Sequence, residues 1–149
     1  MHEVACGTGF WSRRVADVVA SLDPTDGTPE VVEEARRNGV PARVADAWAP
    51  PPQGAAVLAM FWFSHLRVGE RAGWCAAMGD GPLFLADNEL VPGLGGELVE
   101  RDGDRWKRRE EAGQVWEIVK NYPCDAELLA LLPGAELRRG RFYWWLWRG

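Results

Sequence analysis

With 149 residues, of which 47% are hydrophobic and 26% charged, the chain has the size and composition of one globular domain. Its net charge of −5 at pH 7 argues against DNA or RNA as a partner, because nucleic-acid-binding proteins usually carry a basic stripe. No apolar run approaches the roughly 20 residues that cross a bilayer, so we expect no membrane partner.

Cysteine and histidine are too sparse for a disulfide framework or a His-rich metal site. The cysteines are Cys6, Cys75 and Cys124, and they include no CxxC pair. We therefore expect a cytoplasmic protein in a reducing compartment, with no metal. Nine tryptophans are a surplus for this length and suggest an aromatic-lined cavity or a covered interface.

The first third of the chain alternates strand and helix patterns. Residues 3–5 predict a strand end that runs into a glycine turn, and residues 10–19 predict a helix with valines at helical spacing. A short extended piece over 20–27 closes in a turn. Thr28-Pro29-Glu30 then predicts the start of a second helix, and Asn38-Gly39 predicts its end.

The middle of the chain continues the alternation. Residues 42–45 predict a brief strand, and the apolar run 55–63 predicts a strand buried on both faces. A helix over 70–78 and another buried strand over 82–86 follow. Alternating units whose strands end in polar residues predict a Rossmann-like, doubly wound, mostly parallel α/β sheet.

The pattern changes in the last third. Residues 97–120 predict a β-rich insertion of hairpins, followed by a short helix over 125–132. Two strands, 135–138 and 142–147, predict an antiparallel C-terminal hairpin. We expect one domain over residues 1–149 that contains all of these elements.

Ligands of open parallel sheets bind at the carboxyl ends of strands, beside the switch in strand order. Four predicted ends are polar or glycine-rich, namely 5–9, 25–27, 46–48 and 61–65. A glycine turn lets backbone N–H groups approach a ligand closely. A carboxylate at the second end can accept hydrogen bonds from ribose hydroxyls, and one at the third end can accept from an adenine amino group while a neighbouring aromatic ring covers the base. These ends suit a nucleoside-bearing cofactor.

The same residues resemble those of a known family. Glu3-Val4-Ala5-Cys6-Gly7-Thr8-Gly9 resembles motif I of class I S-adenosylmethionine (SAM)-dependent methyltransferases. Asp26-Gly27-Thr28-Pro29-Glu30 resembles the acidic strand end of that family at its typical interval, and Asp46-Ala47 resembles its adenine-contacting pair. Three later segments resemble motifs of a bacterial small-molecule subgroup: Phe61-Trp62-Phe63-Ser64-His65, Asp87-Asn88 and Val119-Lys120-Asn121-Tyr122-Pro123. The motifs fall in family order over nearly the whole chain.

The resemblance implies a SAM-dependent methyltransferase that moves a methyl group to a small-molecule acceptor and leaves S-adenosylhomocysteine (SAH). It implies cofactor contacts from all four strand ends: Glu3, Ala5, Cys6, Gly7, Gly9, Asp26, Gly27, Asp46, Ala47, Trp48 and Phe61. For three of these a plainer reading stands beside it, because Asp46 could cap a turn, Trp48 could belong to the core, and Cys6 is expected to pack within its turn.

His65 is the candidate catalytic residue. A neutral imidazole near pH 7 can take a proton from an acceptor hydroxyl, and His65 follows the longest buried strand. The alternatives are a structural histidine and one that only orients the acceptor.

Two departures from the family pattern leave other functions open. From the way this sequence begins we expect the usual fuller first strand and helical N-terminal lid to be missing, and exposed aromatics left by that lid would favour a homodimer. Pro24 lies where the second strand should run, so either Asp23 or Asp26 could mark its end. A non-catalytic nucleotide-binding protein or subunit of this fold is one alternative. A nicotinamide-dependent oxidoreductase is a weaker one, since Ser12 stands where its motif needs a third glycine.

Overall fold

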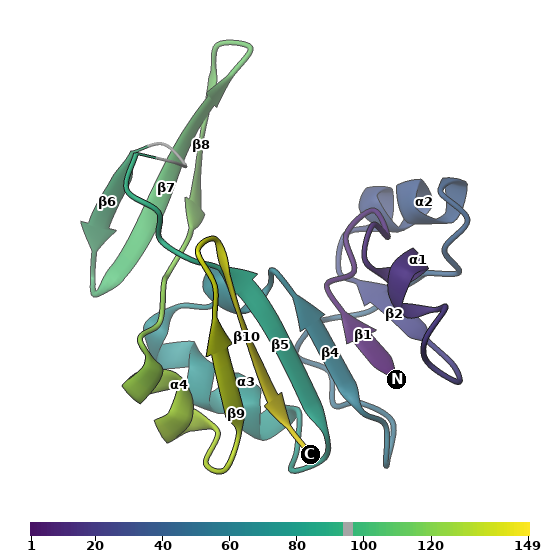
Figure 1. The fold of residues 1–149 in the computed structure, drawn as a ribbon. Helices are drawn as coiled ribbons and strands as arrows, with labels where there is room; N and C mark the ends of the chain where they lie inside the picture. The colour runs from purple at the N-terminus through teal and green to yellow at the C-terminus, as the bar shows by residue number, and fades with distance from the viewer. Residues whose placement is uncertain (94–96) are drawn as a thin grey trace.

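A seven-stranded sheet forms the centre of the computed structural model, which describes residues 1–93 and 97–149 (Figure 1). Its strands are β1 (His2–Val4), β2 (Asp23–Asp26), β3 (Arg43–Val44), β4 (Val57–Met60), β5 (Leu83–Asn88), β9 (Glu136–Arg139) and β10 (Tyr143–Arg148). The spatial order is β3-β2-β1-β4-β5-β10-β9. The first five strands are parallel, and β10 lies antiparallel to both β5 and β9. The predicted mostly parallel sheet with an antiparallel C-terminal hairpin is confirmed.

Helices lie on both sides of this sheet. They are α1 (Ser12–Val15), α2 (Pro29–Arg37), α3 (Arg71–Ala77) and α4 (Asp125–Leu131), with the short 3-10 turns η1 (Phe63–His65) and η2 (Val68–Glu70). The larger core includes Trp74 of α3 and Leu128 of α4, packed against Leu85 and Trp144 of β5 and β10. A smaller core forms around α2, from Cys6, Val32, Ala35, Val40 and Ala42. No helix in the described part of the chain is long and apolar enough to cross a membrane.

The insertion is a separate three-stranded antiparallel sheet that projects away from the large one (Figure 1). Its strands are β6 (Leu98–Arg101), β7 (Asp104–Glu111) and β8 (Gln114–Val119). Buried Asn121, just after β8, fixes this sheet to the rest: its side-chain Nδ2 donates to the Leu66 carbonyl at 3.0 Å and to Asp104 Oδ1 at 2.8 Å. The expected β-rich insertion is therefore present, and polar contacts attach it.

Two predicted elements are shorter in the structure, namely the helix over 10–19 and the strand over 55–63, of which only β4 forms. The helix expected over 10–19 is regular only over α1, and Val18 is 82% exposed. Because short helices depend on tertiary packing, the unpacked half does not continue the helix.

Pro24 is accommodated inside β2 rather than ending it. The Asp23 N–H donates to the Met1 carbonyl, on the β1 side of the strand. Because successive N–H groups of a strand point to opposite sides, the N–H that Pro24 lacks would point toward β3. There β3 begins only at Arg43, opposite Thr25. No ladder bond is lost, and β2 continues to Asp26.

The last strand has one buried and one exposed face. Trp144 is buried toward α3 and α4, whereas Trp145 and Trp147 lie on the opposite face and are 42% and 38% exposed. A cavity of about 550 Å³ opens on that face, with Phe84 and Tyr143 among its lining residues. The sheet thus presents an aromatic surface on the side opposite α3 and α4.

Candidate functional site

The segment after β1 is a glycine turn with unusual backbone angles. Ala5, Gly7 and Gly9 have φ values of 51°, 58° and 82°, all in the left-handed region. A Cβ at Gly9 would lie 2.4 Å from Val40 Cγ2, so only glycine fits there. Ala5 holds this conformation without that freedom, and strain of this kind concentrates at functional sites.

Asp26 joins the glycine turn to the start of α2. Its Oδ2 accepts a hydrogen bond from the Gly7 N–H at 3.0 Å, and its Oδ1 accepts from the Thr28 N–H at 3.0 Å. The side chain is only half-buried, and each carboxylate oxygen keeps a further acceptor position. Asp26 can therefore accept hydrogen bonds from a ligand while it holds the turn.

The third strand end lies beside the second. The Ala45 N–H donates to the Asp26 carbonyl at 3.0 Å, which places Asp46 next to Gly27. Asp46 is exposed, and its Oδ1 accepts from the Trp48 N–H at 2.9 Å, so it does cap a turn. The structure thus brings Gly7, Asp26 and Asp46 to one solvent-accessible edge of the sheet.

Ala47 and Trp48 anchor this third end on α3. Trp74 Nε1 donates to the Ala47 carbonyl at 2.9 Å. The Trp48 ring is half-buried against the larger core, with Cζ3 3.7 Å from the position of a Cβ at Gly73. Trp48 therefore takes part in the core, as its plainer interpretation expects.

Glu3 is a buried carboxylate without a partner. Its residue is 1% exposed, and neither carboxylate oxygen has a hydrogen bond within the described residues. Burial raises the pKa of Glu3 above its ordinary value, with Ser12 nearby acting in the opposite direction. An isolated buried carboxylate is costly, and a positively charged ligand group would offset that cost.

Cys6 lies in the smaller core between these carboxylates. Burial raises the pKa of its thiol to about 12, and the negative charges of Glu3 and Asp26 add to the effect. The thiol is therefore protonated at neutral pH, and a protonated thiol is a poor nucleophile.

The fourth strand end carries an aromatic bridge. Phe61 follows β4 with φ of 60°, and its ring stacks on Trp11 with 5.9 Å between centroids. Its edge meets Tyr143, at 5.6 Å. These three rings connect the glycine turn to the beginning of β10.

A buried polar network follows directly after Phe61. Ser64 Oγ donates to Asp87 Oδ1 at 2.8 Å, and the Ser64 N–H donates to Asp87 Oδ2 at 2.8 Å. Lys120 Nζ donates to Ser64 Oγ at 2.6 Å and lies 3.3 Å from Asp87 Oδ1. The network links η1, the end of β5 and the end of β8. All three residues lie in segments that carry the resemblance, although Asp87 is not among the four strand ends expected to contact the cofactor.

His65 is held by the insertion. Its Nδ1 lies 2.9 Å from the Val119 carbonyl, which can only accept, so Nδ1 carries the proton. Nε2 is then left with a free lone pair in the neutral ring. Burial lowers the pKa of His65, and the positive charge of Lys120 lowers it further, so the imidazole is neutral at pH 7.

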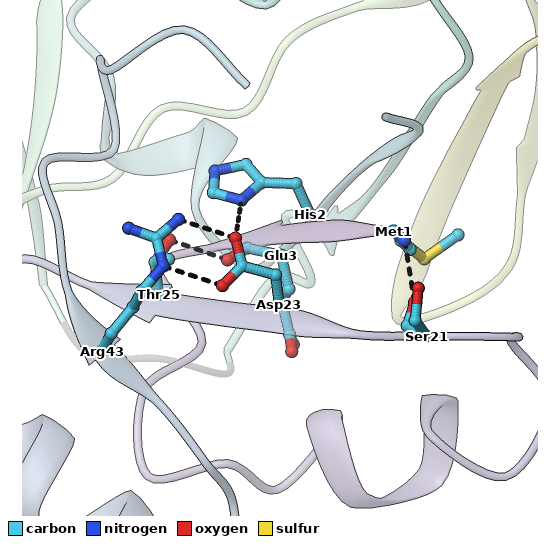
Figure 2. A network of polar contacts seen from close by, with 7 residues as sticks. All are labelled: Met1, His2, Glu3, Ser21, Asp23, Thr25 and Arg43. Carbon is cyan, nitrogen blue, oxygen red and sulfur yellow. Dashed lines mark hydrogen bonds and ion pairs between the residues drawn. The ribbon is translucent and has the colours of Figure 1, made fainter. Parts of the chain in front are cut away.

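Asp23 has a different role at the opposite end of β2. Its carboxylate accepts from Arg43 Nε at 2.8 Å and Nη2 at 2.6 Å, and lies 2.9 Å from His2 Nδ1 (Figure 2). These partners lower the pKa of Asp23 to about 2, the hydrogen bonds from Arg43 having the largest effect. Asp26 and not Asp23 therefore ends the strand at the glycine turn.

Comparison with known proteins was made for sequence and for structure. No family model and no curated protein sequence matches the chain. Among solved structures, the DhpI–SAH complex matches with a TM-score of 0.76 and 22% identity, over 98% of this chain and 74% of that chain. SAM-bound CalS10, an amino pentose methyltransferase from Micromonospora echinaspora, matches with a TM-score of 0.65 and 20% identity, over 99% of this chain and 82% of that one. An S-adenosylmethionine-dependent methyltransferase from Clostridium acetobutylicum matches with a TM-score of 0.67 and 12% identity, over 99% and 83%. The chain has the fold of SAM-dependent methyltransferases.

Proposed function

We propose that this chain binds SAM and transfers its methyl group to a small-molecule acceptor. One observation carries the proposal: the glycine turn and the half-exposed carboxylate of Asp26 meet at one edge of the sheet, and the buried, unpartnered carboxylate of Glu3 lies close enough to Cys6 of that turn to raise the pKa of its thiol. Ligands of this sheet type bind at that edge. The structural neighbours DhpI and CalS10, which were solved with SAH and SAM, support the same cofactor.

The residues present fit the chemistry of SAM. The unpartnered Glu3 carboxylate suits the positively charged methionine end, and the Asp26 oxygens suit the two ribose hydroxyls. Asp46 is exposed beside Gly27 and suits the adenine amino group. In this proposal the remaining contacts come from Ala5, Cys6, Gly7, Gly9, Ala47, Trp48 and Phe61.

SAM supplies a methyl group that is already activated by the positively charged sulfur. When a lone pair of the acceptor bonds to the methyl carbon, the carbon–sulfur bond breaks and SAH leaves. The work of the chain is then to align the acceptor and to exclude water, which can contribute ~7–11 kcal/mol to catalysis. Aromatic rings at Trp11, Phe61 and Tyr143 lie where they can shield such a site.

We propose His65 as the base that takes the proton released by the acceptor. The free Nε2 lone pair and the lowered pKa equip it for this role. In that case kcat/KM should fall as the pH drops through the pKa of His65, below the ordinary value of 6.5. His65→Gln should lower activity and flatten that acidic limb, while SAH binding stays unchanged. An unaltered pH profile in the variant would assign His65 a structural role.

Calorimetry with SAH and with NAD tests the proposed function. We expect SAH to bind and NAD not to bind. Binding of NAD alone would overturn the proposal in favour of an oxidoreductase. Binding of SAH with no turnover of labelled SAM in a metabolite extract would indicate a non-catalytic subunit of the same fold.

We also propose a homodimer, because Trp145 and Trp147 expose an aromatic surface on β10. Sedimentation equilibrium measures the mass directly. A monomer across micromolar concentrations would contradict this part of the proposal.

A further inference from the structure

A second cavity, of about 230 Å³, lies next to the proposed cofactor edge. It opens between the end of β5, the start of β10 and the insertion sheet, and is lined by Asn88, Glu89, Val91, Lys107, Lys120, Tyr122, Phe142 and Tyr143. Tyr143 also touches Phe61 of the aromatic bridge, so the cavity and the glycine turn are connected through three rings.

Both lysines of the chain line this cavity. Lys120 is only 7% exposed, and its ammonium uses two of its three donors on Ser64 and Asp87. The third donor is left for a ligand. Burying a lysine is costly, and its pairing with Asp87 offsets that cost.

The carboxylates around the cavity already have basic partners. Lys120 pairs with Asp87, and Arg139 Nη1 pairs with Glu89 at 2.7 Å, while Arg139 Nε pairs with Asp125. Among the side chains that the structure describes, no carboxylate pairs with Lys107. The cavity therefore has an uncompensated positive charge at Lys107.

Neutral donors complete the lining. Burial raises the pKa of Tyr122, with the charge of Asp87 adding to it, so the phenol keeps its proton and can donate. The Asn88 amide adds donors from the opposite wall. Phe142 and Tyr143 bound the space with aromatic rings.

We propose that this cavity binds an oxyanion, a carboxylate or phosphoryl group, carried by the methyl acceptor. Lys107 provides the uncompensated charge, Lys120 provides its third N–H donor, and Tyr122 provides a neutral hydrogen bond. The inference rests on the proposed methyltransferase function and deepens it, because it restricts the acceptor to small acids and places their anionic group beside Lys107 and Lys120.

Inorganic phosphate is the first probe, titrated into the protein without cofactor at constant ionic strength and followed by amide NMR shifts. Lys107→Met should weaken phosphate binding about tenfold or more, as expected for a lost hydrogen bond between charged groups. Arg108→Met is the matched control, since it removes the same charge from the neighbouring residue of β7, which faces the other side of the strand. Equal affinity in wild type and both variants, or no binding to wild type, would overturn the inference.

The second probe is turnover of labelled SAM with matched acceptor pairs, each an acid and its neutral amide. We expect turnover of acids only, and a Lys107→Met variant with a raised KM and a nearly unchanged kcat. Equal turnover of the amides would also overturn the inference. A wild-type protein that fails to bind SAH in calorimetry would instead refute the proposed function, and the phosphate titration would still stand as its own result.

Discussion

Replacing Asp26 by alanine tests the geometry of the proposed cofactor edge most directly. The carboxylate makes two backbone hydrogen bonds of 3.0 Å, to Gly7 and Thr28, and in the proposed function it also accepts from ribose. Hydrogen bonds to a charged group contribute about 1.5–3 kcal/mol, so Asp26→Ala should raise the Kd for SAH about 10- to 150-fold. Titration calorimetry at constant pH and salt measures this change.

Two measurements separate ligand contact from simple loosening of the turn. Urea unfolding should show that Asp26→Ala remains folded, because water can replace its carboxylate at the partly exposed turn. Asp23→Ala is the matched control: it removes the same side chain from the opposite end of β2, where Arg43 and His2 hold it. The control should bind SAH as wild type does. A folded Asp26→Ala protein with unchanged SAH affinity would refute the ribose role.

Three further substitutions probe β1, β2 and the glycine turn between them. Gly9→Ala should destabilise the fold by about 1–3 kcal/mol more than Gly39→Ala in urea unfolding. The two glycines have the same backbone strain, with φ values of 82° and 81°, but only at Gly9 would a Cβ meet a neighbour, Val40 Cγ2, at 2.4 Å. Equal losses of stability would argue against this close packing. Glu3→Gln should become progressively more stable than wild type in thermal unfolding as pH rises above 4.5, because the raised pKa of Glu3 makes its ionisation cost the folded state more than the unfolded one. The same variant should lose affinity for SAH. A stability difference that does not change with pH would show that Glu3 is not a buried ionising group. Asp23→Asn should make the free energy of unfolding depend less on pH between 3.8 and about 2. The reason is that the lowered pKa of Asp23 lets its pairing with Arg43 stabilise the fold above pH 3.8, and this stabilisation is lost as pH falls. Identical acid unfolding of variant and wild type would contradict that linkage.

The elements that the sequence predicted well are those fixed by local chemistry. The helix α2 (Pro29–Arg37) begins directly after Thr28 and ends before Asn38-Gly39, as the Thr-Pro-Glu start and the Asn-Gly stop predict. The strand expected over 55–63 is shorter, only Val57–Met60, because Phe61 leaves it with a positive φ. No local pattern signals that conformation in a phenylalanine, since it depends on how Trp11 and Tyr143 pack around the ring.

In the candidate site, too, contacts set by local sequence were predictable and contacts set by long-range packing were not. The contact between Gly7 and Asp26 follows from two strand ends that a parallel sheet must bring together. The bonds from Lys120 to Ser64 and Asp87 span 56 and 33 residues. They depend on how the insertion docks, and no spacing in the chain encodes that docking. The exposed aromatic face of β10, by contrast, follows from strand alternation alone, which puts Trp145 and Trp147 on one side and Trp144 on the other.

The attachment of the insertion sheet has a mechanical consequence. Asn121 accepts from Arg105 and donates to Leu66 and Asp104, and Asp104 in turn accepts from the Val68 N–H. Each bond is worth only about 0.5–1.5 kcal/mol, but a pivot of the small sheet would have to break all of them at once. A displacement of the insertion sheet is therefore expected to move the Val119 carbonyl and, with it, its hydrogen-bond partner His65 Nδ1. We expect the insertion sheet and the imidazole to move together.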